Sequence, residues 1–315
     1  MEYKTVDKRR QIISSIYERK PCFLTSPDWR DIAFDTTGLG FDDCLYTEVL
    51  HRMADFSSLL KELKELDEVA QQQHQQPINH AASYFDTDSS SIDFSTDSYN
   101  QELLYSTNLY QTDPTTSSAS PSLSSSSHHH HHHHPYEHAK NDLLNRLHHL
   151  KDILNNVGRH LTANLADGSA AIELPAREEG SPIPTVFHFS SWRVAVAYNC
   201  YWSLLILTNR LICKLLPAYD SLRYTLETEC RNVAYNICQT WEDAWDTRPI
   251  GALHVPLGFV LAHEFCVPDV QEWIIKGLNA LLDQQHVDNF RWSDDVIRMM
   301  SGKLGGEGPG LSFRM

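Results

Sequence analysis

The residues best suited to chemistry form two small groups in the last third of the chain. His263-Glu264 begins a pattern like the metalloprotease motif HExxH, in which two histidines one helical turn apart bind zinc. Residue 267 is Val267, so the second histidine ligand is missing. The simpler interpretation, a polar pair on a half-buried helix, is favoured.

The second group is acidic. Glu242, Asp243 and Asp246 fall beside Trp241 and Trp245, and paired carboxylates can divide acid and base roles between them. Acidic residues at the solvated end of a helix give the same pattern, and this interpretation is favoured. The chain also has no P-loop, GxGxxG or GxSxG sequence. We therefore predict no catalytic, cofactor-binding, metal-binding or DNA-binding residues, and no enzymatic activity.

The metal-binding residue types are scattered or repetitive. Seven cysteines, an odd number, form no CxxC pair and read as free thiols of a reducing, intracellular compartment. The start of the chain, MEYKTVDKRR, lacks the apolar segment of a signal peptide. The tract His128–His134 could bind a transition metal, but a repeat expansion in a tolerant loop is favoured. The cysteines are Cys22, Cys44, Cys200, Cys213, Cys230, Cys238 and Cys266.

One apolar stretch dominates the elements that would position these groups. Ser190–Pro217, SSWRVAVAYNCYWSLLILTNRLICKLLP, is the longest apolar run in the chain. Its uninterrupted part is shorter than the roughly 20 residues of a membrane span, because Asn209-Arg210 breaks it. Pro217 supplies a helix stop. We predict a helix buried on most sides by other helices, and no membrane span.

Other helices are expected on both sides of this stretch because apolar residues recur at helical spacing. The predicted helices cover residues 4–20, 42–69, 136–158, 219–245, 251–266 with a kink at Pro256, a segment starting at Pro268-Asp269, and 290–300. Residues 21–34 are expected to be extended, with Phe23, Trp29 and Phe34 anchored in the core. No alternating strand pattern stands out, and residues 166–185 read as a connection. The predicted fold class is all-α, an irregular multi-helix regulatory domain.

Composition divides the chain into four parts. Residues 71–134 are rich in Gln, Ser, Thr, Asp and His and nearly lack aliphatic residues. Such a segment cannot bury enough apolar surface to offset its ordering entropy. We predict a disordered low-complexity insertion there, within one helical domain. The N-terminal part covers residues 1–70, the main part 135–302, and a flexible tail 303–315.

The charge balance argues against nucleic-acid binding. The formal net charge is −15, whereas nucleic-acid binders need a clustered basic face. The short basic group Lys8-Arg9-Arg10 is interpreted as the solvated face of a helix. No direct nucleic-acid contact is therefore expected from this chain.

Two ordered sets of segments resemble a known family. The first is KPCFLTSPDWRDIAF, an acidic turn and a Leu-rich helix, within residues 20–66. The second, within residues 190–290, joins the central run, the CRNVAYNICQTWEDAW helix and GALHVPLGFVLAHEFCVPDVQEWIIKGLNAL. Their order is similar to that of the fungal-specific transcription-factor domain, the helical regulatory region of fungal binuclear zinc-cluster proteins. The resemblance covers about two-thirds of the chain.

The sequence departs from this family in one respect. Family members carry an N-terminal six-cysteine zinc cluster that places a helix against DNA. Here only Cys22 and Cys44 precede residue 200, so no zinc-liganding or DNA-contacting residue carries over. The resemblance implies the first helices of the regulatory region are absent as well.

The resemblance implies a nuclear transcriptional regulator, compatible with control of a metabolic gene cluster, that acts through its helical domain. Its partners would be proteins: a second copy, a co-regulator or a full-length relative. A first alternative is a small-molecule sensor with Tyr198, Tyr201 and Trp202 bordering a pocket, although a core role for these aromatics is favoured. A protein-interaction domain without a role at DNA, and an uncharacterised enzyme using His263 or Glu264, are the others. No cofactor is expected.

Overall fold

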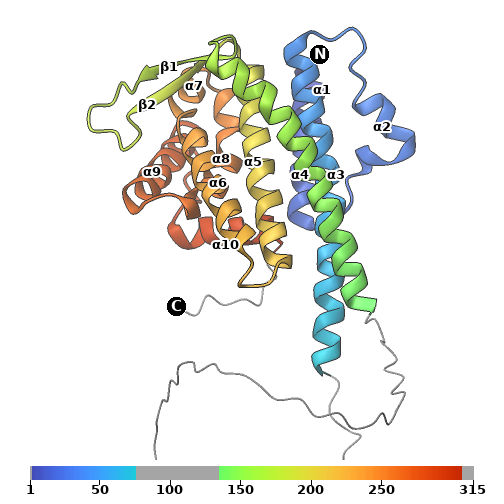
Figure 1. Cartoon of the computed structure of the whole chain (residues 1–315). Helices are drawn as coiled ribbons and strands as arrows, with labels where there is room; N and C mark the ends of the chain where they lie inside the picture. The colour runs from blue at the N-terminus through green and yellow to red at the C-terminus, as the bar shows by residue number, and fades with distance from the viewer. Residues whose placement is uncertain (1, 76–134, 307–315) are drawn as a thin grey trace, which may run out of the picture. The chain divides into compact units, whose positions relative to one another are not determined.

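The central apolar stretch forms helix α5, Trp192–Leu215, in a computed structural model of the chain (Figure 1). The hydroxyl of Ser191 caps its first turn by accepting a hydrogen bond from the backbone N–H of Val194 at 3.3 Å. Pro217 follows the last turn. Almost every residue from Val194 to Leu215 is buried, which confirms the prediction of a core helix.

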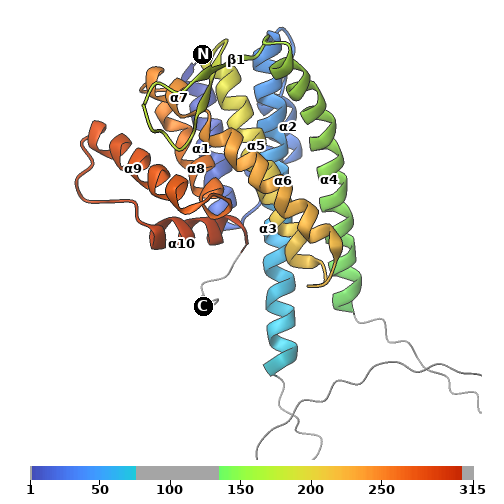
Figure 2. The same cartoon turned by 60° about the vertical axis from the view of Figure 1, so that its left-hand side comes forward.

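Other helices surround α5. Helices α4 (Pro135–Ala166), α6 (Ser221–Cys238) and α8 (Val255–Ala262) pack against it, and α6 lies beside α5 in both views (Figures 1 and 2). Helix α3 (Phe41–Gln75) joins them through an ion pair of 2.7 Å between Asp67 and Lys214 of α5. Helix α1 (Glu2–Glu18) contacts α10 (Asp294–Leu304). The all-α class is confirmed.

The structure describes residues 2–75 and 135–306. The described segments before and after the low-complexity stretch belong to one unit. Helix α3 continues to Gln75, beyond the predicted end at Val69, so residues 71–75 are helical and not disordered as predicted. The rest of the predicted disordered insertion, with His128–His134, lies outside the described residues.

The expectation of an extended segment over residues 21–34 is wrong. A short 3-10 helix, η1 (Phe23–Thr25), leads into α2 (Pro27–Ala33). Pro27 suits the first helical turn, where its missing N–H would have no acceptor. Phe23 and Trp29 are about half exposed and are not anchored in the core, whereas Phe34 packs against it.

The connection predicted over residues 166–185 instead contains part of a β-hairpin. Strand β1 (Ala171–Pro175) pairs antiparallel with β2 (Thr185–Phe189), with Ala171 opposite Phe189. The hairpin covers α5 because Phe187 stacks on Trp202 at 6.0 Å between ring centroids. Strands of five residues carry too little alternation to be recognised before their packing partner is known.

The helix predicted over residues 219–245 is broken into α6 and α7 (Trp241–Asp246). Gln239 causes the break. Its carbonyl oxygen accepts a hydrogen bond from the N–H of Phe187 in β2 at 2.9 Å, and its side chain donates to Thr185 at 2.8 Å. Bonds to the hairpin replace the bonds that would continue the helix.

The predicted kink at Pro256 is also wrong. Pro256 occupies the first turn of α8, after the 3-10 helix η2 (Gly251–Leu253), so it begins a helix and bends none. A third 3-10 helix, η3 (His263–Phe265), follows α8, and α9 (Pro268–Gln284) starts at the predicted proline. Helix α10 begins and ends four residues later than predicted, and its last residue, Leu304, is fully buried. The first two residues of the predicted tail, 303 and 304, therefore belong to α10. Residues 307–315 lie outside the described residues.

Candidate functional site

A cleft of about 750 Å³ opens beside the C-terminal half of α5. Its walls come from α5, α6 and the segment around η3, and Gly305 also lines it. The volume falls in the range of about 300–1,000 Å³ typical of small-molecule sites. The lining residues are Asn209, Arg210, Cys213, Lys214, Arg223, Glu227, Cys230, Arg231, Glu264, Phe265, Cys266, Val267 and Gly305.

Positive charge predominates in this cleft. Four cationic side chains line it, against the carboxylates of Glu227 and Glu264. Arg231 approaches Glu227 at 3.7 Å, and both are about half exposed, so this pair contributes little to stability. Lys214 is also paired with Asp67 at 2.7 Å, so the excess of positive charge that an anion in the cleft would meet is small. The four cationic residues are Arg210, Lys214, Arg223 and Arg231.

Internal hydrogen bonds hold two of the arginines in place. Arg210 donates to the hydroxyl of Ser301 at 2.6 Å and pairs with Glu264 at 3.2 Å. Arg223 donates to the carbonyl oxygens of Cys213 and Leu216 at 2.6 and 3.1 Å. These carbonyl oxygens lie at the end of α5, where no N–H group of the helix donates to them. Arg223 thus fixes the end of α5 and its own position.

Three thiols line the same cleft: those of Cys213, Cys230 and Cys266. Burial raises the pKa of Cys213 and raises that of Cys230 to about 12. A hydrogen bond from the thiol of Cys238 lowers the pKa of Cys266 and raises that of Cys238. Cys266 is therefore the thiol in this cleft whose thiolate is favoured.

The predicted pair His263-Glu264 does not form a joint site. Both residues lie in η3, but their side chains contact different partners. His263 is buried, its Nε2 lies 3.6 Å from Asp294, and burial lowers its pKa. Glu264 instead accepts a hydrogen bond from Ser301 at 3.2 Å and faces the cleft.

The acidic group is likewise divided. Glu242 and Asp246 both bind Arg177, at 2.7 and 2.6 Å, and these bonds raise the pKa of the guanidinium. Asp243 is not at a solvated helix end, which corrects the favoured interpretation. It is buried, it accepts a hydrogen bond from the N–H of Phe189 at 3.1 Å, and burial raises its pKa.

The aromatics proposed as a pocket wall belong to the core. Tyr198, Tyr201 and Trp202 are all buried. The hydroxyl of Tyr198 donates to the carbonyl oxygen of Leu161 at 2.8 Å, which ties α5 to α4. Tyr198 borders a small cavity of about 120 Å³ near the start of α5, but none of the three lines the cationic cleft.

The basic group Lys8-Arg9-Arg10 is not a solvated face throughout. Arg9 is buried and donates to the carbonyl oxygens of Leu253 and His254, at 3.1 and 3.3 Å. Lys8 donates to the carbonyl oxygen of Ala33 at 2.6 Å. Arg9 thus helps to hold η2 and the start of α8 against α1.

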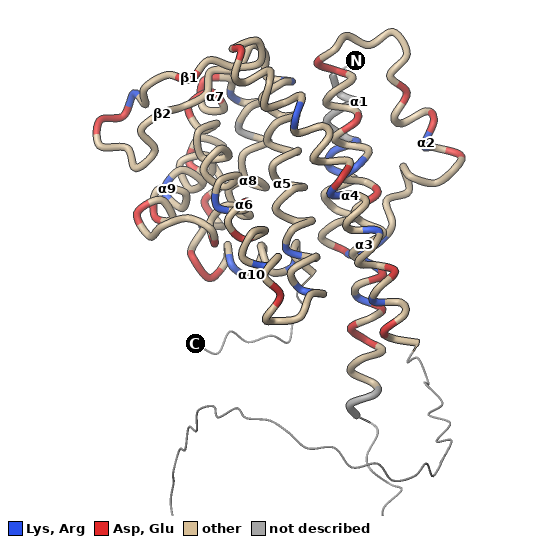
Figure 3. Tube along the Cα trace, in the orientation of Figure 1, with Lys and Arg blue, Asp and Glu red and all other residues tan. Residues whose placement is uncertain are grey.

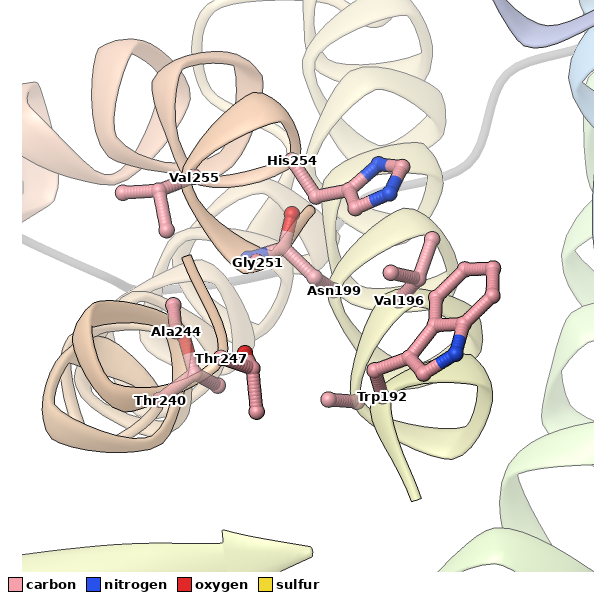
Figure 4. A pocket seen from close by; sticks show the side chains of 10 residues that line it. Trp192, Val196, Asn199, Thr240, Ala244, Thr247, Gly251, His254 and Val255 are labelled. Atoms are coloured by element: carbon pink, nitrogen blue, oxygen red, sulfur yellow. The ribbon is translucent and has the colours of Figure 1, made fainter. Parts of the chain in front are cut away.

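A second, much smaller pocket lies beside His254 (Figure 4). Its volume of about 20 Å³ is close to the space one water molecule needs. Trp192 stacks on the His254 ring with the ring planes 8° apart, and burial, with a smaller effect of Arg9, lowers the pKa of His254 to about 2. The pocket is too small for an organic ligand, and His254 acts there as a neutral, structural group.

The cleft is the part of the site that the sequence did not predict. The sequence shows the polar pair Asn209-Arg210 that interrupts the apolar run, and these two residues line the α5 side of the cleft. The wall from η3 and Gly305 is far away in sequence, so no local pattern indicates that these residues meet. Among the described residues, no group of three or more His, Cys, Asp or Glu side chains is placed to hold a metal ion.

No helix in the described ranges combines the length and apolar character required to cross a membrane. Comparison of the chain with family models, with curated proteins and with solved structures found no match in any of the three.

Proposed function

We propose that this chain is a nuclear transcriptional regulator of the fungal zinc-cluster kind, compatible with control of a metabolic gene cluster, that acts through protein contacts made by its helical domain. The support comes from the resemblance of its ordered segments and from the α2 patch, defined as Phe23, Trp29 and Ile32. These side chains are 49, 51 and 70 % exposed. Large apolar side chains gathered on a surface mark sites of protein contact.

The α2 patch is organised for contact. Phe23 meets Trp29 edge to face, with ring centroids 6.0 Å apart. Ile32 follows Trp29 by three residues in α2, so both lie on one helix face, while Ala33 is buried. Tryptophan is among the residues that contribute most to binding energy at interfaces. The patch also lies within the segment that carries the family resemblance.

Charge supports a role through proteins rather than through direct nucleic-acid contact. Figure 3 shows Lys and Arg interspersed with Asp and Glu along the described helices. Arg9, the centre of the basic group in α1, is buried. With a net charge of −15, the chain would be repelled by a phosphate backbone.

A reporter assay tests the proposal. The whole chain is fused to a heterologous DNA-binding domain, and expression from a promoter carrying its site is measured. We expect a change in expression that the double variant Trp29→Ser/Ile32→Ser abolishes. The matched control Tyr219→Ser, at a side chain that is 92 % exposed elsewhere, should behave as the unchanged chain. No change in expression with the unchanged chain would contradict the proposal.

The alternative, small-molecule sensing, is favoured by one observation. The cationic cleft has the volume and charge for a small anion, although Tyr198, Tyr201 and Trp202 do not line it. Thermal unfolding of the purified chain in the presence of small carboxylates and phosphates tests this function. A raised midpoint that the Arg231→Gln variant reduces would support it, and a screen without a shift would oppose it.

A further inference from the structure

Helix α2 presents its side chains in a fixed order around its axis. Each residue of an α-helix is turned by roughly 100° from the residue before it. Passing around α2 from the buried Ala33, the side chains therefore follow in the order Trp29, Ile32, Asp28 and Asp31. The exposed apolar stripe of Trp29 and Ile32 is thus bordered, on the side away from the core, by an acidic stripe of Asp28 and Asp31.

The acidic stripe is not compensated by the described part of the chain. Asp28 and Asp31 are both exposed, and neither forms an ion pair with another described residue. Arg30, the basic residue of α2, lies on the other side of the helix and approaches Asp55 of α3 at 3.6 Å. The two aspartates therefore leave negative charge beside the apolar stripe.

The segment that carries both stripes is held in place from its inner side. The ammonium group of Lys8 donates to the carbonyl oxygen of Ala33, the last residue of α2, at 2.6 Å. The backbone N–H of Cys22 donates to the hydroxyl of Ser57 in α3 at 3.0 Å. Figure 1 shows α2 at the outer edge of the described helices. A partner would therefore meet a surface that is already ordered, which reduces the entropy lost on binding.

The two stripes together indicate which kind of partner fits. Helices pack by their apolar stripes, and charges that border the contact pair with opposite charges on the other helix. An apolar stripe beside an acidic one therefore fits a helix with large apolar side chains beside Lys or Arg. The contact offered by two helical turns and Phe23 is small, as in transient complexes.

Charge argues against two occupants that the chain itself could supply. Residues 76–134 contain six acidic residues and neither Lys nor Arg, so this segment would bring like charge to the acidic stripe. A second copy carries the same formal net charge of −15, which opposes self-association. A different protein with a basic surface has the complementary charge.

We propose that the α2 patch and its acidic stripe dock an amphipathic helix of another protein, in which Lys and Arg border the apolar side. The inference rests on the proposed function, because it describes the partner through which the helical domain would act. Trp29 and Ile32 supply most of the binding energy. Asp28 and Asp31 select a basic partner and make its binding dependent on salt.

Fluorescence anisotropy with labelled peptides and the whole purified chain tests this surface. The probe is a helical peptide of about 18 residues, or five turns, with leucines on one face and lysines along one border of that face. In one control peptide glutamate replaces lysine, and in another serine replaces leucine. We expect only the first peptide to bind, and its binding to weaken as salt is added. Equal binding of the glutamate peptide, or no binding of the lysine peptide, would overturn the proposal.

Variants of the chain then locate the binding. Asp28→Asn/Asp31→Asn should weaken binding of the lysine peptide by about fivefold, as expected for two exposed charge pairs, and Trp29→Ser should weaken it by about tenfold. The matched control is Asp269→Asn/Glu272→Gln, which removes two exposed carboxylates from the corresponding positions of α9, a helix that also begins with Pro-Asp. It should leave the affinity unchanged. Equal losses in both double variants would refute a specific acidic stripe.

Sedimentation velocity of the unchanged chain decides about self-association. A dimer that Trp29→Ser/Ile32→Ser dissociates would show that a second copy occupies the surface, and would overturn the proposal. The reporter assay separates this inference from the proposed function. If the reporter responds but the lysine peptide does not bind, the inference fails alone. If the peptide binds at α2 but the reporter does not respond, the transcriptional role fails alone.

Discussion

Asn199 of α5 and Gly258 of α8 approach so closely that a Cβ atom at residue 258 would lie 2.8 Å from both the amide nitrogen and the amide oxygen of Asn199. It would also lie 3.0 Å from Ile237 of α6. Three helices therefore meet where only glycine fits. The contact explains why α8 contains Gly258 although glycine destabilises the interior of a helix.

Gly258→Ala should destabilise the chain. Overpacking costs about 1–3 kcal/mol, and the gain in helix propensity offsets only about 1 kcal/mol of it. Gly40→Ala is the matched control, since a Cβ there meets nothing within 4 Å. Chemical denaturation gives both free energies of unfolding, and a Gly258→Ala variant as stable as the Gly40→Ala variant would contradict the close approach. Adding Asn199→Ala should recover part of the loss if the two residues are coupled.

His254 should make the stability depend on pH. Its pKa is lowered from 6.5 to about 2 in the folded chain, so the unfolded chain binds a proton that the folded chain does not. Stability is therefore fully present above pH 6.5 and falls as the pH decreases from 6.5 towards 2. Between pH 7 and pH 5 the loss from this one residue is about 2 kcal/mol.

Comparing the unchanged chain with His254→Gln isolates this effect, because glutamine does not titrate. We expect the free energy of unfolding of the variant to fall less between pH 7 and pH 5, by about 2 kcal/mol. His286→Gln is the control, at an exposed histidine. Parallel pH profiles for the unchanged chain and His254→Gln would show that His254 is protonated in the folded state.

Lys151 and Glu229 form a largely buried ion pair between α4 and α6. Asn209 of α5 also donates to Glu229, at 2.8 Å, so one carboxylate joins three helices. Glu229→Gln leaves the ammonium group of Lys151, a residue only 9 % exposed, without its counter-charge. Loss of a charged hydrogen bond of this kind costs about 1–3 kcal/mol.

The exposed pair Lys64–Glu68, at 3.7 Å within α3, supplies the control for that variant. Glu68→Gln should change the free energy of unfolding by less than about 0.5 kcal/mol. Urea denaturation of both variants compares the two sites directly. Equal losses would mean that Glu229 does not hold the three helices together.

Tyr198→Phe should cost about 0.5–1.5 kcal/mol, because it removes the buried hydrogen bond from the Tyr198 hydroxyl to the carbonyl oxygen of Leu161, a residue within α4. Tyr224→Phe removes the same hydroxyl from a side chain that is 72 % exposed and should be neutral. The difference between their unfolding midpoints measures the bond between α5 and α4. Equal midpoints would contradict the predicted contribution of this bond to stability.

Local patterns predicted the elements whose own periodicity is strong. The burial of α5 followed from an apolar run too long for a strand, and the start of α9 followed from Pro268. Predictions failed where a distant segment supplies the hydrogen bonds. Gln239 ends α6 because β2 binds it, and Pro256 begins α8 because η2 precedes it. Periodicity contains no information about such partners.

The sequence by itself determined that this is an all-α chain centred on one buried helix, because burying apolar surface at helical spacing is a local property of the residues. Only the tertiary structure decided where the polar groups lie. It separated His263 from Glu264, buried Arg9 and Asp243, and brought Cys238 beside Cys266 at the cationic cleft. The energy of a charge or thiol depends on burial and on neighbours far away in the chain, which the fold alone supplies.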